Sequence, residues 1–174
     1  ETLYLNDCYK HPLTGHMCNQ NQINTGNTLW GDKYYHSWFG MQPQGMAKEH
    51  YADFYNYKIT KPILLYETGY EHLWSSYQVA LRYGYFAMLL GSCGYGYGAH
   101  GVWNGNVDTK VWMNYGGYMR WFEGVRQPGA KELVIMNSFF RSIKWYELVP
   151  HFDNAEDWDG ADKYAVYASL GDHS

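Results

Sequence analysis

Short apolar runs alternate with segments of helical periodicity along most of the chain. The clearest run is Ile63–Leu65, which is followed within two residues by Glu67 and then by glycine and further acidic residues. Such a run predicts a buried strand that ends in a polar loop. Apolar residues at spacings of three and four predict helices over residues 46–57, 76–90 and 133–143. This alternation predicts βαβ units and a parallel sheet.

Three further segments are predicted as strands. They are Leu3–Asn6, Tyr35–Met41, which ends at a Pro/Gly turn, and Tyr95–Trp103, whose glycines allow close backbone approach. Another helix, over residues 118–126, is expected to stop before a proline. The long polar stretch of residues 10–33 is typical of a functional loop. After a serine cap, the helix over residues 76–90 is expected to bury a stripe of Val79, Ala80, Tyr83, Ala87 and Leu90.

The pattern changes after residue 152. An acidic, loop-like stretch, Asp153–Asp162, is followed by Tyr164–Ala168, which reads as a strand. We therefore expect residues 1–152 to form one α/β unit, and residues 153–174 to form a linker and the first strand of a second, all-β domain. The chain begins with Glu1 rather than Met and ends just after a predicted strand. Both ends are therefore expected to be artificial.

Composition narrows the function classes. Only 17% of the residues are charged, the net charge is -4, and no run of five like charges occurs, so the chain lacks the electrostatic footprint of a nucleic-acid or anionic-membrane binder. The chain contains no stretch of 18 apolar residues, which is the length that would predict a membrane span, and no signal peptide is visible. Aromatic residues make up 20% of the chain, with 19 Tyr and 8 Trp. Their amphipathic rings suit sugar ligands, although a Tyr-rich core and surface is an equal alternative.

The cysteines, the histidines and Ser92 lack the spacings of disulfide-rich, metal-binding or esterase sites. Three cysteines are too few for a disulfide framework or a zinc site; free thiols are expected, with a bridge from Cys8 to Cys18 as the alternative. The histidines show neither HxH nor HExxH spacing, so we expect no metal and no cofactor. Ser92 lies in a Gly-Ser-Cys-Gly segment, which is not the GxSxG elbow of an esterase.

Glu67 is the strongest candidate for a catalytic group. In a parallel barrel the reactive side chains lie at the C-terminal ends of strands, where the loops converge. A carboxylate at the end of an apolar strand is held rigidly, as a nucleophile or an acid requires. The alternative is a Glu that pairs with an arginine or caps the next helix. Glu71 could reach the same cleft, but a structural role is favoured, in a loop that is mobile or tied to the following helix.

His100 and Trp103 are candidate sugar contacts. They follow the glycine-rich strand, where an aromatic face could form the floor of a sugar subsite. For each of them, however, the structural alternative carries more weight before any family is considered, since a Trp beside glycines often fills the core and a lone His is often a hydrogen-bonded structural residue.

At this point several motifs, in order, carry a family resemblance. The segment from Lys61-Pro62 to Glu67-Thr68-Gly69-Tyr70-Glu71 and the segment from Gly91 to Trp103 resemble two strand motifs of the apiosidase-like glycoside hydrolases. The tail of that family is similar to Trp121, Gln127–Ala130, Phe139-Phe140, Trp145 and Leu148–Pro150 of this chain. His36–Gly45, with Gln42, and His11-Pro12 fit two upstream motifs more loosely. The resemblance covers roughly residues 36–150 well.

The resemblance implies a fold and a reaction. It implies that the chain is the C-terminal half of a (β/α)8 TIM barrel that leads into a β-sandwich, and that Glu67 is the nucleophile of a retaining glycosidase acting on a plant or microbial polysaccharide or its side chains. Two departures bear on substrate contacts: Thr68 replaces the family's proline and Tyr95 its histidine. The expected sugar-binding residues are Trp103, His100, Tyr97, Gln42, His11, Tyr70 and Glu71.

One part of the expected machinery is absent from the chain. The family carries its acid/base carboxylate on an earlier strand, and retaining chemistry needs two carboxyl groups roughly 5 to 5.5 Å apart. We therefore expect the N-terminal half of the same protein as a partner, packed against the apolar segments Leu3–Leu5 and Ile63–Leu65, with a carbohydrate as substrate and a secreted, periplasmic or cell-surface location. The alternatives are a carbohydrate-binding protein without catalysis on the same barrel, and a structural or adhesion protein.

Overall fold

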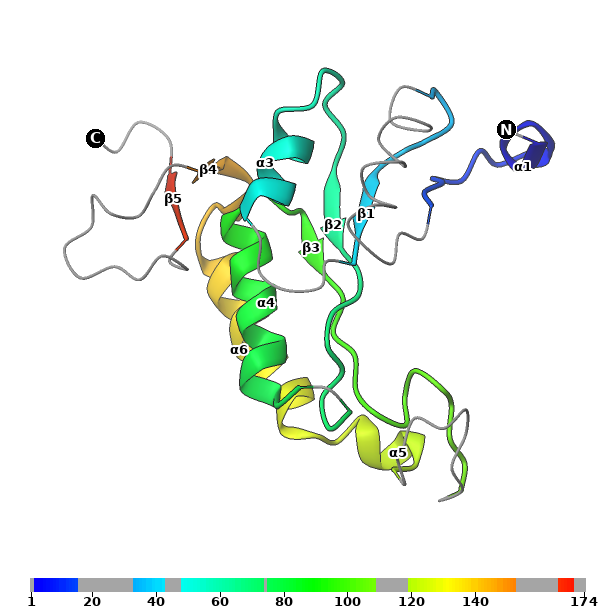
Figure 1. Ribbon diagram of the computed structural model, residues 1–174, viewed down its shortest axis with the longest axis vertical. Helices are drawn as coiled ribbons and strands as arrows, with labels where there is room; N and C mark the ends of the chain where they lie inside the picture. Colours follow the sequence, from blue (N-terminus) through cyan, green and yellow to red (C-terminus); the bar gives the residue numbers. More distant parts are fainter. Residues whose placement is uncertain are drawn as a thin grey trace.

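A small parallel sheet organises the chain. The computed structural model describes residues 2–15, 33–42, 48–73, 75–108, 119–152 and 166–170. Strands β1 (Phe39–Met41), β2 (Ile63–Leu65) and β3 (Gly94–Tyr95) lie in that order and run parallel, with Phe39 opposite Ile63 and Leu65 opposite Tyr95 (Figure 1). The predicted parallel βαβ arrangement is therefore confirmed, although β1 begins at Phe39 rather than at Tyr35.

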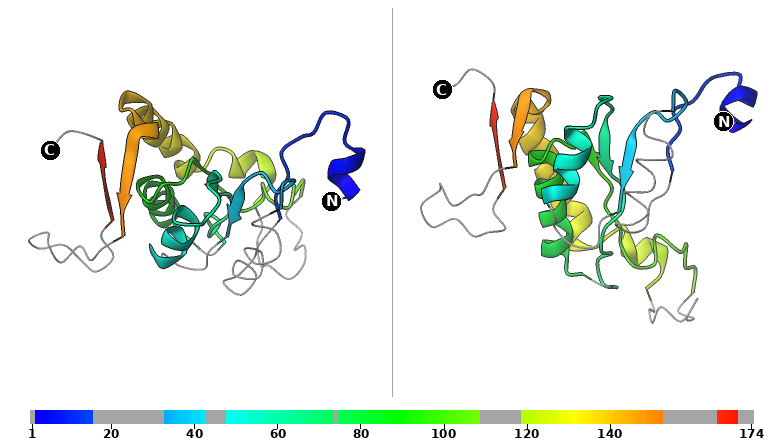
Figure 2. Two further views of the ribbon diagram at one scale, coloured as in Figure 1. Left: turned by 90° about the horizontal axis from the view of Figure 1, so that it is seen from above. Right: turned by 45° about the horizontal axis from the view of Figure 1, so that its top comes forward.

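Helices cover one face of this sheet. They are α3 (Lys48–Tyr55) and α4 (Tyr77–Leu89), while α6 (Pro128–Ser142) packs beside α4 (Figure 2). Because side chains alternate along a strand, one face of β1 and β2 points to the helices. The core lies there and consists of Phe39, Met41, Tyr51, Phe54, Ile63, Leu65, Phe86, Ala87 and Leu90. Leu64, on the other face, is only partly buried.

The predicted helices are present with shifted ends. Ser76 caps α4, and its hydroxyl accepts a hydrogen bond from Val79 N–H. Ala80, Ala87 and Leu90 of the predicted stripe are buried, whereas Val79 is 38% exposed because it lies in the first turn, beside the cap. The helix predicted over residues 118–126 is the short α5 (Trp121–Gly124), and Tyr118 lies outside the described residues.

Leu3–Asn6 is not a buried strand. Residues Thr2–Asn6 form the short helix α1, in which Leu3 is 77% and Leu5 59% exposed. So few residues cannot separate the two periodicities, and the side-chain amide of Asn6 and the N–H of Asp7 donate to carbonyls one turn back, which closes a helical turn. The expectation for Ile63–Leu65 also needs correction: β2 is the middle strand, and Ile63 and Leu65 pack on helices of this same chain.

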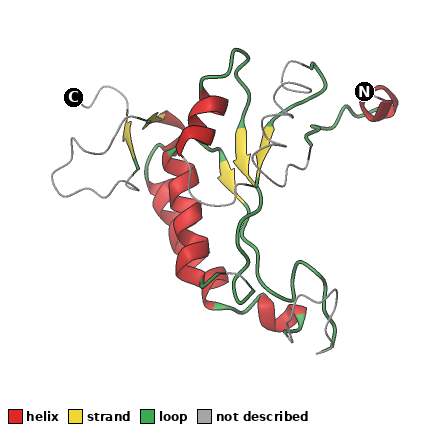
Figure 3. Ribbon diagram, in the orientation of Figure 1, coloured by secondary structure: helices red, strands yellow, loops and turns green. Residues whose placement is uncertain are grey.

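A second, antiparallel sheet joins distant parts of the chain. The short 3-10 helix η1 (Trp145–Glu147) leads into β4 (Leu148–His151), which pairs with β5 (Tyr167–Leu170) (Figure 3). The imidazole of His151 stacks on the Tyr167 ring at 4.7 Å. The strand predicted at Tyr164–Ala168 thus overlaps β5, while residues 153–165 lie outside the described residues. β4 and β5 lie on opposite sides of the predicted boundary at residue 152 and pair with each other. This sheet does not decide where one domain ends and the next begins, so the domain division stays a prediction.

None of the helices that the structure describes combines the length and apolar content of a membrane-spanning segment.

Candidate active site

The loops that follow the three parallel strands meet at one edge of the sheet. Gln42 comes directly after β1, Glu67 lies two residues after β2, and Tyr97 lies two residues after β3. Because the strands are parallel, their C-terminal ends face the same way, and loops at this edge form the active sites of β/α barrels. The fold therefore assembles side chains that are up to 55 residues apart at the place where catalytic groups lie in such folds.

Tyr70 connects Glu67 to Trp103. Its hydroxyl donates a hydrogen bond to Oε1 of Glu67, and its ring stacks on the Trp103 indole with centroids 5.6 Å apart and an interplanar angle of 20°. A Cβ atom at Gly98 would overlap the Tyr70 ring, so a glycine is required where the loop after β3 passes. Glu67, Tyr70 and Trp103 thus form one contiguous cluster, referred to below as the Tyr70 cluster.

Glu71 faces the protein interior. It is 1% exposed, and its Oε2 accepts hydrogen bonds from the Tyr97 hydroxyl and, at 3.1 Å, from the Gly129 N–H at the start of α6. The expectation of a mobile loop is therefore wrong, and the helix that holds Glu71 is α6 rather than the one that follows it. Burial and the hydrogen bond to Glu71 raise the pKa of Tyr97, so its hydroxyl stays protonated and donates to the carboxylate.

The two histidines proposed as sugar contacts lie in different settings. His100 is 2% exposed, and among the described residues neither of its ring nitrogens has a hydrogen-bond partner. Its backbone N–H donates to the Glu71 carbonyl at 2.8 Å, which places it next to the Tyr70 cluster in the fold. His11 is exposed, and within the described part of the chain its hydrogen bonds are to Asp7, at 2.9 Å from the ring. The structure thus does not bring His11 to Glu67.

Gln42 and Tyr95 also lie at or near the C-terminal ends of the parallel strands. Gln42 is half-buried, and its Oε1 has no hydrogen-bond partner within the described ranges. Tyr95, which stands where the resembling family has a histidine, donates its hydroxyl to the Ala80 carbonyl of α4 at 2.6 Å. Burial raises the pKa of Tyr95 to about 12, so this hydroxyl remains a donor to α4.

Sequence reasoning missed two residues of the site. Gly129 admits the Glu71 carboxylate, since a Cβ atom there would lie 2.5 Å from Oε2 of Glu71, and Gly98 admits the Tyr70 ring. A glycine directly after a proline at a helix start was the available signal for Gly129, but its partner is 58 residues away. In the described residues no group of three or more His, Cys, Asp or Glu side chains is arranged to hold a metal ion.

Comparisons with known proteins identify the family and the type of fold. A family model described as "Apiosidase-like, catalytic domain" matches residues 7–147. The parallel β/α units of the chain match part of a glycoside hydrolase fold: the chain resembles the crystal structure of a glycoside hydrolase family 5 protein from Bacteroides vulgatus, with a TM-score of 0.62 and 15% identity over 72% of this chain and 33% of that one. It also resembles a structure named "Glycoside hydrolase", with a TM-score of 0.59 and 18% identity over 75% of this chain and 37% of that one.

The chain belongs to the apiosidase-like catalytic domain family of glycoside hydrolases. It spans about a third of the length of each of the two solved structures. None of the curated proteins compared with it matches its sequence.

Proposed function

We propose that this chain is the part of a retaining glycosidase that carries the nucleophile, and that Glu67 is that nucleophile. The observation that supports this most is the position of Glu67 at the C-terminal end of a central parallel strand, with the Tyr70 hydroxyl donating to its carboxylate. A nucleophile must also be held in one orientation toward the reacting carbon, and a donated hydrogen bond to its carboxylate restrains it in this way. The family and the fold of the structural relatives support the same reaction class.

The chemistry follows the two-step retaining scheme. The Glu67 carboxylate attacks the anomeric carbon, the glycosidic C–O bond breaks, and a second carboxylic acid protonates the departing oxygen. A water molecule, deprotonated by that same second group, then cleaves the glycosyl ester and releases Glu67. The stacked Tyr70 and Trp103 rings supply an aromatic surface beside the nucleophile on which a sugar ring can pack. The substrate is a plant or microbial polysaccharide or its side chains, which implies a secreted, periplasmic or cell-surface enzyme.

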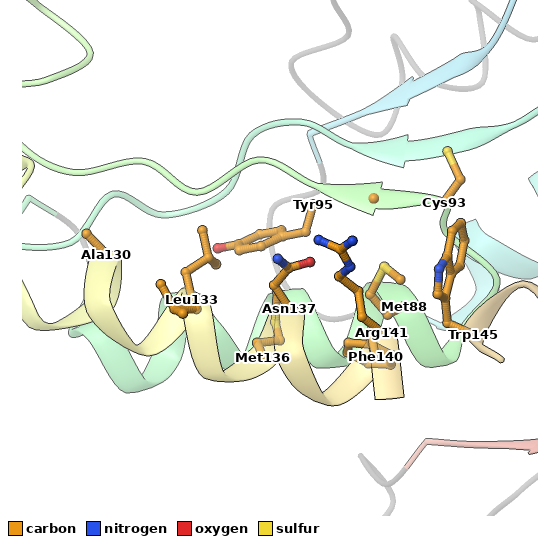
Figure 4. Close-up of a pocket in the computed structure, with 12 residues that line it drawn as sticks. Met88, Cys93, Tyr95, Ala130, Leu133, Met136, Asn137, Phe140, Arg141 and Trp145 are labelled. Carbon is orange, nitrogen blue, oxygen red and sulfur yellow. The ribbon is translucent and has the colours of Figure 1, made fainter. Parts of the chain in front are cut away.

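The second carboxylate is proposed to come from the polypeptide that completes the barrel. Within the described residues β3 pairs only with β2, to which the N–H groups of Cys93 and Gly96 donate at 2.7 Å each. The other edge of β3 faces an open groove of about 610 Å³ between β3 and α6. Figure 4 shows Leu133, Asn137 and Arg141 projecting from α6 toward β3. An unpaired strand edge leaves backbone hydrogen-bonding groups without partners. We therefore propose that the next parallel strand of the barrel, from the rest of the protein, lies in this groove and pairs with β3.

The stereochemistry of the product tests the proposed reaction. The polypeptide that includes both barrel halves is expected to hydrolyse a glycoside with net retention at the anomeric carbon, because two displacements invert it twice. Proton NMR spectra recorded in the first minutes of hydrolysis, before mutarotation, measure this outcome. A first-formed product of inverted configuration would contradict the nucleophile assignment, and binding of the sugar without hydrolysis would favour the non-catalytic alternative.

A further inference from the structure

Glu71 is the buried carboxylate that the proposed reaction leaves without a role. A carboxylate that is 1% exposed needs donors to offset its lost hydration. Oε2 has two, the Tyr97 hydroxyl from the loop after β3 and the Gly129 N–H of α6. The positive end of the helix dipole adds a favourable interaction there. Oε1 lies 3.8 Å from the imidazole Nε2 of His72. One carboxylate thus links three segments: its own loop, the loop after β3 and the start of α6.

The backbone of Glu71 is fixed as firmly as its side chain. Its N–H donates to the Gly98 carbonyl at 3.0 Å, and its carbonyl accepts from the His100 N–H at 2.8 Å, so the loops after β2 and β3 form a short parallel bridge at Glu71 and Ala99. Two hydrogen bonds of the backbone and two of the side chain therefore meet at one residue. A rotation of the Glu71 side chain would break both hydrogen bonds to Oε2, and a shift of its backbone would break the bridge between the two loops.

This anchoring bears directly on the proposed nucleophile. Tyr70 precedes Glu71, and in an extended segment neighbouring side chains point to opposite sides. With Glu71 held inward, Tyr70 is directed to the other side, where Trp103 and Gly98 confine its ring and its hydroxyl donates to Glu67. The position of the Tyr70 hydroxyl, and through it the orientation of the Glu67 carboxylate, depends on where Glu71 is held.

We propose that Glu71 is a positioning residue: its buried carboxylate, held by Tyr97 and by Gly129 at the start of α6, sets the place of Tyr70 and thereby aims Glu67. This inference rests on the proposed function of Glu67. It assigns to the start of α6 the role of holding the loop that carries Tyr70.

Two variants approach the same contact from opposite sides. Glu71→Gln keeps the side-chain volume but replaces the charge-assisted hydrogen bonds from Tyr97 and Gly129 with weaker ones, and it places an NH2 donor in a site that is 1% exposed, so the loop is held less firmly. Gly129→Ala leaves Glu71 intact, but its Cβ atom would lie 2.5 Å from Oε2 and displace the carboxylate, although alanine is the better helix former. In the polypeptide that includes both barrel halves, referred to below as the barrel-complete polypeptide, both variants are expected to show a kcat that is lower by about 10- to 100-fold. A small misplacement of a reacting group has an effect of this size. KM is expected to change by less than about threefold.

The control is Glu132→Gln, the same chemical change at an exposed position of α6, which is expected to leave kcat unchanged. Near-ultraviolet circular dichroism of the 174-residue chain needs no substrate, and because 8 Trp and 19 Tyr contribute to it, the part due to the Tyr70–Trp103 stack is identified as the signal that Tyr70→Ala removes. This part of the signal is expected to change in both variants. If Glu71→Gln does not fold, Gly129→Ala decides. Unchanged kcat per folded molecule, or a rise in KM alone, would overturn the proposal. If the proposed glycosidase function fails, the dichroism signal still tests whether Glu71 sets the place of Tyr70, and an unchanged signal would overturn that inference.

Discussion

Replacement of Glu67 by Gln in the barrel-complete polypeptide is expected to abolish glycoside turnover, with a loss in kcat on the order of 10³-fold or more. The amide has nearly the same shape as the carboxylate, so the Tyr70 hydroxyl keeps an acceptor and the stack of Tyr70 on Trp103 remains. The neutral amide, however, cannot form the glycosyl ester. Sugar binding is expected to stay close to that of the parent protein. Steady-state kinetics and calorimetric titration with the product sugar measure the two effects.

The matched comparison for this variant is again Glu132→Gln, because it makes the same change on an exposed helix surface. A thermal unfolding curve establishes that each variant is folded before its kinetics are compared. Turnover close to that of the parent in folded Glu67→Gln protein would refute the assignment of the nucleophile.

Placing a lysine in the groove between β3 and α6 is expected to weaken association with the rest of the barrel by on the order of 100-fold. Val134 lines this groove and is 64% exposed in this chain, so Val134→Lys should not destabilise the chain itself. It would, however, bury an ammonium group under the incoming strand, which is costly without a partner. Affinity between the 174-residue chain and the complementary barrel half, produced as separate polypeptides, measures the effect.

Ile135→Lys is the control for this experiment. Ile135 is 60% exposed but lies on the flank of α6 that carries Phe139, which contacts Tyr85 of α4. Cys93 gives an independent readout, since it lines the groove and is exposed in this chain. Its alkylation, followed peptide by peptide, is expected to slow when the complementary half is present. Equal affinities of the two lysine variants for the complementary half, together with alkylation of Cys93 that the complementary half does not slow, would contradict the proposed position of the next strand.

Local patterns were sufficient for β2 and for the position of Glu67, whereas the strand predicted over Tyr95–Trp103 is only the two-residue β3, Gly94–Tyr95, followed by loop and turns. The Ile63–Leu65 run predicted a buried strand because it is flanked by polar loops, and the strand is the middle one of the parallel sheet. Periodicity likewise located α6, whose Met136 and Phe140 are buried as expected. Leu3–Asn6 failed because so short a segment has no measurable period, and the outcome depended on hydrogen bonds between neighbouring turns.

The arrangement around Glu67 depended on contacts that no local pattern contains. Glu71 was expected in a mobile or locally tied loop, yet its carboxylate is held by Gly129, which is 58 residues away. The Tyr70 hydroxyl on Glu67 is a contact three residues apart, but it forms only because Gly98 admits the Tyr70 ring. In both cases a glycine determines the site by leaving space, and the need for that space is visible only once distant loops lie side by side.

Trapping of the covalent intermediate tests the identity of the nucleophile most directly. A 2-deoxy-2-fluoro glycoside of the sugar that the barrel-complete polypeptide cleaves slows both steps, and a good leaving group lets the ester accumulate. After digestion and tandem mass spectrometry, we expect one glycosyl group per protein, attached to Glu67. A label on any other carboxylate, or active protein that accumulates no label, would contradict the assignment of Glu67 as nucleophile.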